Sequence, residues 1–181
     1  MDIKYKIEFH TDWHCGSGLA AGADVDALVV KDKEGMPFIP GKTIKGLVRE
    51  AVEDIRGFRR MTEDEAFLEA FGYFDDKEDK CKGCMFFTNA ELPKNEYDAI
   101  VSNKAARFMY RTIASTAIND EGIAVEHSLR KMQVVVPCTL HGEIKGIPDE
   151  MVAEIEQALS FIKRLGQNRN RGLGRCTITK E

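Results

Sequence analysis

Residues 166–174 read Gly-Gln-Asn-Arg-Asn-Arg-Gly-Leu-Gly, and the rest of the chain can be arranged around this glycine-rich loop. An amphipathic helix is predicted before it, over Asp149–Leu165, and a short strand directly after it, over Arg175–Thr179. Glycine accepts positive φ and lets the backbone approach a partner closely. The pattern therefore predicts a tight helix-to-strand turn near the end of the domain.

Three arginines lie in or beside this loop, namely Arg169, Arg171 and Arg175, and no acidic residue lies between Arg164 and Lys180. Guanidinium groups suit planar, bidentate recognition of phosphate. The loop is interpreted as a phosphate-binding turn, with an ordinary solvated turn as the alternative. A second basic stretch, Ile-Pro-Gly-Lys-Thr-Ile-Lys-Gly at residues 39–46, favours phosphate binding.

Size and composition indicate one globular domain. The chain has 181 residues, of which 43% are hydrophobic, enough for a sizeable core. Small insertions are expected at about 14–38 and 72–83, where the sequence is glycine-rich or acidic. No segment approaches the ~18 apolar residues of a membrane span. No apolar run typical of a signal peptide occurs at the N-terminus, and the five cysteines are expected to be reduced in a cytoplasm.

Charge is distributed unevenly along the chain. The net charge of −4 argues against a protein that is basic all over. Residues 41–60 nevertheless carry six basic against three acidic residues, residues 164–175 carry four basic and no acidic ones, and residues 62–79 carry eight acidic against one basic. Two basic regions can therefore bind a polyanion while an acidic region faces away from it.

Hydrophobic periodicity predicts the order of the elements. Residues Ile3–Thr11 alternate as a half-buried strand, and a helix is predicted up to Phe58 with Thr43 as its N-cap. A second helix, Glu63–Phe71, is expected to be capped by Thr62. The other expected elements are a hairpin of Ala27–Val30 with Met36–Ile39, strands at Cys84–Leu92, Ile123–Val125, Met132–Val136 and Thr139–Ile147, and a short helix at Tyr97–Val101. Residues Asn103–Ile118 are interpreted as an extended, mobile segment. This order predicts an α+β, ferredoxin-like core with insertions.

Two aspartates precede the predicted hairpin. Asp24 and Asp26 alternate along an extended chain, so they should point to opposite faces, and at most one serves a given site. A carboxylate beside a phosphate chain can position a metal ion or a 2′-hydroxyl. The alternative is a turn or capping aspartate.

Cysteine and histidine positions suggest weaker sites. Cys81-Lys-Gly-Cys84 has the spacing of a zinc knuckle, but no second pair exists, so further ligands would come from distant segments. An ordinary loop is the alternative. His14, next to Trp13, is a candidate for stacking on an RNA base, although such residues are more often packed in a core. Gly41-Lys42-Thr43 looks like the end of a P-loop but lacks the upstream glycine.

Taken together, these stretches resemble the RAMP superfamily of CRISPR-associated proteins. The similarity rests on Pro-Phe-Ile-Pro-Gly-Lys-Thr-Ile-Lys-Gly-Leu-Val-Arg at 37–49, on Asn-Arg-Asn-Arg-Gly-Leu-Gly-Arg at 168–175, on Trp-His-Cys-Gly-Ser-Gly at 13–18, and on the central strand at 84–92. Within the superfamily the chain looks most like the repeated backbone subunit of type III effector complexes.

The resemblance implies a modified RNA-recognition-motif-like fold and a subunit that associates with itself along a guide RNA, with target RNA and other subunits as partners. RNA contacts are expected from Lys42, Lys45, Arg49, Arg169, Arg171, Arg175 and His14. Asp26 matches the family's catalytic aspartate, which implies cleavage with Mg²⁺ or another divalent cation. Leu28 replaces the usual proline, and the short chain implies a trimmed thumb or lid. A non-catalytic or end-capping subunit, and a metal-independent endonuclease using His14 or His10, are the alternatives.

Overall fold

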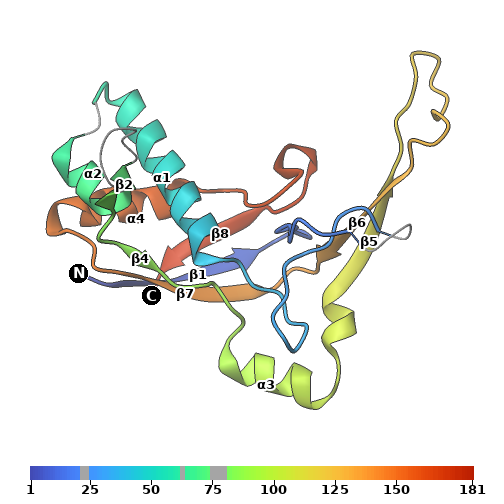
Figure 1. The fold of residues 1–181 in the computed structure, drawn as a ribbon, viewed down its shortest axis with the longest axis horizontal. Coiled ribbons are helices and arrows are strands. Elements are labelled where there is room, and N and C mark those ends of the chain that lie inside the picture. The colour runs from blue at the N-terminus through green and yellow to red at the C-terminus, as the bar shows by residue number, and fades with distance from the viewer. Residues whose placement is uncertain (21–24, 62–63, 74–80) are drawn as a thin grey trace.

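A computed structural model describes residues 1–20, 25–61, 64–73 and 81–181, except for the side chain of Cys81. Its centre is a four-stranded antiparallel sheet in the order β4 (Phe86–Phe87), β7 (Thr139–Lys145), β1 (Ile3–Phe9), β8 (Cys176–Lys180) (Figure 1). Helix α1 (Gly41–Phe58) connects β1 to β4, and α4 (Val152–Phe161) connects β7 to β8. This β-α-β-β-α-β order is ferredoxin-like, which confirms the predicted fold class.

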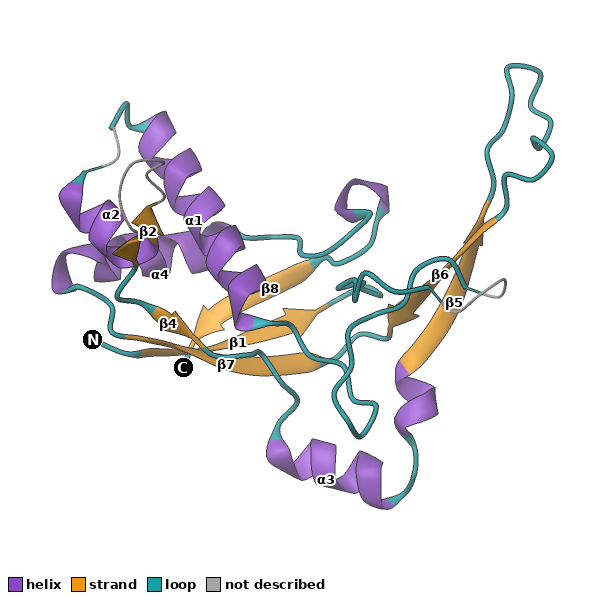
Figure 2. Ribbon diagram, in the orientation of Figure 1, coloured by secondary structure: helices purple, strands orange, loops and turns teal. Residues whose placement is uncertain are grey.

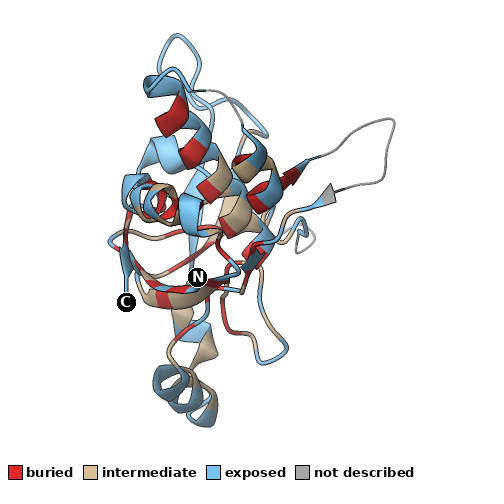
Figure 3. Ribbon diagram, turned by 90° about the vertical axis from the view of Figure 1, so that its left-hand side faces the viewer, coloured by how far each residue is buried: buried red, intermediate tan, exposed pale blue. Residues whose placement is uncertain are grey.

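The alternation in β1 places one face of the sheet in the core. Ile3, Tyr5 and Ile7 are fully buried, and Ile7 pairs with Leu140 of β7 and Ile178 of β8 in one apolar row. Helices α1, α2 (Glu65–Phe71) and α4 lie on the same side of the sheet (Figure 2). Figure 3 shows the buried residues along the sheet and along the inward sides of these helices.

Helix α1 begins at Gly41 with Pro40 at the N-cap, so the prediction that Thr43 caps it was wrong. The Asn89 side-chain oxygen accepts a hydrogen bond from Gly41 N–H at 3.1 Å and takes the place of a local cap. A Cβ on Gly41 would lie 2.0 Å from the Phe87 carbonyl oxygen of β4. The Pro-Gly pair thus lets the helix start directly against a strand, a constraint that comes from tertiary packing.

Helix α2 begins two residues later than predicted. Asp64 is its N-cap, and its carboxylate accepts from Phe67 N–H at 2.9 Å. The predicted cap, Thr62, lies outside the described residues. The predicted helix Asp149–Leu165 is a 3₁₀ turn, η2 (Asp149–Met151), followed by α4, which ends at Phe161 because Ile162 takes an extended conformation.

The described residues of the two predicted insertions contain little regular structure. In the segment between β1 and α1, the expected hairpin of 27–30 with 36–39 is reduced to isolated bridges, among them Lys31 with Pro37 around a turn organised by Asp32. In the second insertion, β2 (Gly72–Tyr73) pairs with β3 (Cys81–Lys82). The predicted strand 84–92 is regular only at β4, and residues 123–125 form no strand.

An arm projects from the body, where the sequence suggested an extended, mobile segment (Figure 1). Helix α3 (Lys94–Ser102) and the 3₁₀ turn η1 (Ala106–Met109) lead into β5 (Tyr110–Ser115), which pairs antiparallel with β6 (Arg130–Val135). The segment therefore contains regular structure, and its strand β5 forms a projecting hairpin with β6. The trimmed thumb or lid stays a prediction. Among the described residues, no helix is long and apolar enough to cross a membrane.

Candidate nucleic-acid interface

The glycine-rich loop is held in a strained, closed shape. Gly166 has φ +95° and Gly174 has φ +68°, and a Cβ at these positions would lie 2.3 Å from the His14 carbonyl oxygen and 1.9 Å from the Leu165 carbonyl oxygen. Gln167 N–H donates to the His14 carbonyl at 2.9 Å, and the short 3₁₀ turn η3 (Arg169–Arg171) forms the tip. Only glycine fits both positions, so the sequence correctly predicted a tight turn.

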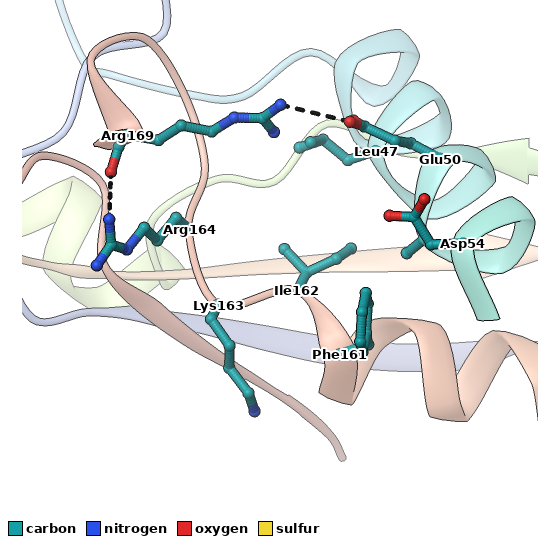
Figure 4. Close-up of a pocket in the computed structure, with 9 residues that line it drawn as sticks. Leu47, Glu50, Asp54, Phe161, Ile162, Lys163, Arg164 and Arg169 are labelled. Carbon is teal, nitrogen blue, oxygen red and sulfur yellow. Dashed lines mark hydrogen bonds and ion pairs between the residues drawn. The ribbon is translucent and has the colours of Figure 1, made fainter. Parts of the chain in front are cut away.

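The loop arginines point to different places. Arg171 lines a cleft that Asp26 also lines. Arg169 lies 3.4 Å from Glu50 of α1 and lines a separate pocket (Figure 4). Arg175 is exposed and follows the loop, and its backbone N–H donates to Thr11 Oγ1. The three guanidinium groups therefore do not form the single clamp that their spacing suggested.

Asp26 is exposed and fixed by strand β6. Its N–H donates to the Lys131 carbonyl at 2.9 Å, and Lys131 N–H donates to Asp26 Oδ2 at 2.7 Å. The adjacent Ala27 continues this contact in a parallel bridge with Met132. Both backbone groups of Lys131 thus hold the aspartate, while Oδ1 has no hydrogen-bond partner within the described chain. Asp24 lies outside the described residues.

The cleft beside Asp26 has a volume of about 490 Å³, which is in the ~300–1,000 Å³ range of ligand sites. We call it the arm cleft. Its lining combines the glycine-rich loop, the arm and the start of the first insertion, and consists of Asp26, Ala27, Ile113, Ser115, Arg130, Lys131, Met132, Asn168, Arg171 and Leu173. Three cationic groups oppose one carboxylate, and four apolar side chains adjoin them. Such a surface can hold a phosphate and a nucleoside together.

Arg130 and Lys131 were missed by the sequence analysis. They lie between the predicted strands Ile123–Val125 and Met132–Val136, and no local pattern indicates that β6 runs beside residues 26–27. The one signal in the sequence was that two basic residues stand next to each other, and such pairs are common on exposed strands without any binding role.

His14 lies under this site and is fully buried, so it cannot stack on a base as predicted. Its Nδ1 lies 2.6 Å from the Gln133 carbonyl oxygen, which can only accept, so Nδ1–H donates and Nε2 carries the lone pair. Nε2 is buried without a partner among the described residues. The His14 residue lines a small cavity of about 200 Å³ that Asp26 and Gln167 also line.

The other predicted RNA-binding residues lie on α1, outside the lining of the arm cleft. Lys42 is exposed, and Lys45 is half-buried, with a pKa lowered by burial and then by the neighbouring Arg49. Arg49 itself is bound to Glu53 at 2.7 Å and to the Gly72 carbonyl at 3.1 Å, and its guanidinium lies over the Phe67 ring. These contacts occupy the Arg49 guanidinium and fix α2 against α1, which argues against the predicted contact of Arg49 with RNA.

The cysteine pair remains a predicted zinc site. Cys84 is exposed and its Sγ lies 3.5 Å from the Gly146 carbonyl oxygen, whereas the Cys81 side chain is outside the described part. Within the described ranges, no three His, Cys, Asp or Glu side chains cluster as metal ligands. His10 is bonded to Thr177 Oγ1 at 2.8 Å and lines neither of the cavities beside Asp26.

Comparison with known proteins shows the family and supports the fold. The family model of the RAMP superfamily matches residues 6–177. A chain in the cryo-EM structure of a type III-B Cmr-beta complex bound to cognate target RNA has a TM-score of 0.76 at 11% identity, covering 99% of this chain and 97% of that chain. A chain of the apo-state complex gives 0.72 at 13% identity with the same coverage. These similarities are in fold. No curated protein matches the sequence.

Proposed function

The chain belongs to the RAMP superfamily, and from this premise we propose that it is a guide-RNA-binding backbone subunit of a type III CRISPR effector complex. The observation that carries the proposal is the arm cleft, which Arg130, Lys131 and Arg171 line together with Asp26 next to the glycine-rich loop. Cationic groups around an open, partly apolar cleft attract a phosphate backbone and leave room for a base or sugar.

The similar solved structures support a role as a subunit of a type III effector complex. Both similar chains are parts of a type III-B complex, one of them with target RNA bound. By analogy, we propose that residues 1–181 act as one RNA-binding domain with other complex subunits, guide RNA and target RNA as partners, and that the complex works in the cytoplasm.

We further propose that Asp26 takes part in cleaving target RNA. The 2′-hydroxyl of RNA can serve as the nucleophile: it gives up its proton and attacks the adjacent phosphorus to form a cyclic phosphate, while the bond to the 5′-oxygen breaks and that oxygen takes up a proton. The protein therefore need supply only position, charge and proton transfer. Lys131 N–H holds Oδ2, and Oδ1 has no hydrogen-bond partner among the described residues. Arg171 and Lys131 can neutralise the phosphate on either side of the bond that breaks.

A divalent cation fits this site only together with RNA. Mg²⁺ takes about six oxygen ligands, of which one or two are usually protein carboxylates and the others water and phosphate oxygens. Asp26 Oδ1 offers one ligand, and phosphate oxygens in the cleft would offer others. Such a cation would supply Lewis-acid stabilisation of the phosphate during cleavage.

Two alternatives share this geometry. A subunit that binds RNA without cutting would use the same cationic lining, with Asp26 serving only to fix β6. A metal-independent nuclease is favoured by one observation: His14 Nε2 is buried without a partner among the described residues, and His14 lines a cavity that Asp26 also lines. That nitrogen could accept a proton if a nucleotide entered the cavity.

The test is cleavage of labelled target RNA by the reconstituted complex. Asp26→Asn keeps an oxygen for Lys131 N–H, so the fold and RNA binding should persist while cleavage is lost. Asp98→Asn, at an exposed position on α3, is the matched control and should cut normally. EDTA should mimic Asp26→Asn. Cutting that survives EDTA but not His14→Gln would favour the metal-independent nuclease, and no cutting by the wild type would favour the non-catalytic subunit.

A further inference from the structure

An aromatic side chain stands in solvent where the arm joins the body. Phe108 lies in the 3₁₀ turn η1, which Figure 1 shows between α3 and β5. Its side chain is 67% exposed. Because a single exposed apolar residue is ordinary, its role has to be inferred from what surrounds it.

The shape of η1 explains why Phe108 points outward. A 3₁₀ helix has three residues per turn, so the two residues before Met109 lie on the sides away from it. Met109 and the following Tyr110 pack against the core, and the Tyr110 hydroxyl donates to the Gly35 carbonyl at 2.5 Å. The turn is therefore anchored on its inner side and presents Arg107 and Phe108 to solvent.

Arg107 covers one face of the Phe108 ring. Its guanidinium carbon lies 4.7 Å from the ring centroid, the arrangement of a cation–π contact. The exposed area of the ring is therefore on its other face and its edges. A nucleobase that stacks on the open face would complete a three-layer stack, and a guanidinium next to a base can also bind the neighbouring phosphate.

The segment around Phe108 attracts phosphate. Residues 99–119 contain no acidic residue and three basic ones, which are Lys104, Arg107 and Arg111. Arg111 lies 3.4 Å from Asp12, whereas Lys104 and Arg107 have no carboxylate partner among the described residues. An exposed aromatic ring beside unpaired cations is typical of surfaces that bind single-stranded nucleic acid.

Strand β5 connects this surface to the arm cleft. Ile113 and Ser115 line the cleft, and Arg111 points to the same side of the strand because side chains alternate along it. A strand rises about 3.4 Å per residue, so Arg111 lies about 7 Å from Ile113, and Phe108 comes just before the strand begins. One RNA chain can therefore contact the cleft and the ring with nucleotides that are close in its sequence.

We propose that the Phe108 ring stacks on one unpaired nucleobase of single-stranded RNA, while Arg107 and Lys104 bind the adjoining phosphate. The proposal rests on the proposed RNA-binding function and adds a base-contacting site outside the arm cleft. Every base has a π-face, so this site should bind RNA without a strong sequence preference.

The test measures the affinity of the full chain for a single-stranded RNA of mixed sequence, by fluorescence anisotropy from low to high salt. Phe108→Ala should weaken binding about 5- to 150-fold, the effect of removing one stacked base. Its slope of log affinity against log salt should equal that of the wild type, because no charge is removed. Arg107→Gln should instead reduce this slope by about 0.7. Phe86→Ala, at a 63% exposed ring on β4, is the matched control and should bind like the wild type.

Tryptophan fluorescence reports the stacking itself. Phe108→Trp keeps a large ring at this position, so it should bind RNA at least as tightly as the wild type. Its emission should be quenched as RNA is added, because a stacked base contacts the indole. The native Trp13 is fully buried and supplies a constant background. Phe86→Trp is the control and should keep its emission.

The possible results separate this site from the arm cleft. If the wild type binds RNA, unchanged affinity in Phe108→Ala or unquenched emission in Phe108→Trp would overturn the stacking site and leave the arm cleft in place. Emission that changes only when other subunits of the complex are added, without RNA, would identify a protein contact and overturn it as well. A wild-type chain that binds no single-stranded RNA would overturn this proposal together with the proposed function.

Discussion

Replacing Gly174 by alanine tests whether the glycine-rich loop owes its shape to backbone constraints. The added Cβ would lie 1.9 Å from the Leu165 carbonyl oxygen, at a residue with φ +68°. Leu165 N–H donates to the Gly174 carbonyl at 2.9 Å, so the two residues close the neck of the loop. Relief of the contact must open this neck and shift the loop.

The magnitude follows from two separate costs. A left-handed conformation costs a non-glycine residue about 1–2 kcal/mol, and overpacking against a rigid neighbour costs about 1–3 kcal/mol. Gly174→Ala should therefore destabilise the protein by about 2–5 kcal/mol, a large share of the ~5–15 kcal/mol of a typical domain. At about 2–4 °C per kcal/mol for this chain length, Tm should fall by roughly 4–20 °C.

Two other glycines serve as matched controls. Gly172 has φ +93° but open space around its Cβ position, so Gly172→Ala should cost only the conformational ~1–2 kcal/mol. Gly46 lies exposed within α1 with nothing within 4 Å, so Gly46→Ala should stabilise the protein by about 0.5–1 kcal/mol. Thermal and urea unfolding followed by circular dichroism measure all three. Equal stabilities for Gly174→Ala and Gly172→Ala would refute the role given to the close contact.

Three further predictions concern helix α2 and the cysteine pair. The pKa of Asp64 is lowered from 3.8, first by the Phe67 N–H and then by Arg56, so Asp64→Asn, which keeps the cap, should destabilise at pH 7. The difference in stability between wild type and Asp64→Asn should shrink and vanish as the pH falls below about 4. Asp64 becomes protonated in the folded protein over this range, and the stabilisation by its carboxylate is then lost. Arg49→Ala should lower Tm by a few degrees in thermal unfolding, because the contacts of Arg49 with α2 and Gly72 are lost. RNA affinity in a filter-binding assay should not change. A loss of RNA affinity in this variant would instead assign Arg49 to the RNA site. If Cys81 and Cys84 hold zinc, elemental analysis should find it in stoichiometric amount, and replacing both by serine should remove it.

Much of the core could be predicted from periodicity. Ile3, Tyr5 and Ile7 alternate, and apolar residues repeat along α1, because these side chains are buried between the helices and one face of the sheet. Burial against a sheet face produces the same sequence patterns in many folds. The start of α1 could not be predicted, because Asn89 and Phe87 reach Gly41 from a distant strand. The first strand of the arm, β5, was missed because its residues are mostly exposed and show no buried face, whereas β6 overlaps the predicted strand Met132–Val136.

The candidate site was predicted residue by residue but not as an arrangement. Asp26 and Arg171 were identified from the sequence, and the fold brings both to one cleft. Arg49 and His14 were assigned to RNA because side-chain chemistry alone does not show that a guanidinium is already engaged or a ring is buried. The backbone N–H of Lys131 holds the Asp26 carboxylate, and such a backbone contact cannot be predicted from the residue type.

The most direct test of RNA binding in the arm cleft compares two arginines of the same loop. Arg171 lines the cleft, whereas Arg169 turns away to Glu50. The affinity for single-stranded guide RNA is measured from low to high salt for Arg171→Ala and Arg169→Ala. Arg171→Ala should weaken binding and reduce the slope of log affinity against log salt by about 0.7, the value for one phosphate contact on a single strand, while Arg169→Ala should change neither. Equal losses from both variants, or no loss from Arg171→Ala, would contradict the assignment of RNA to the arm cleft.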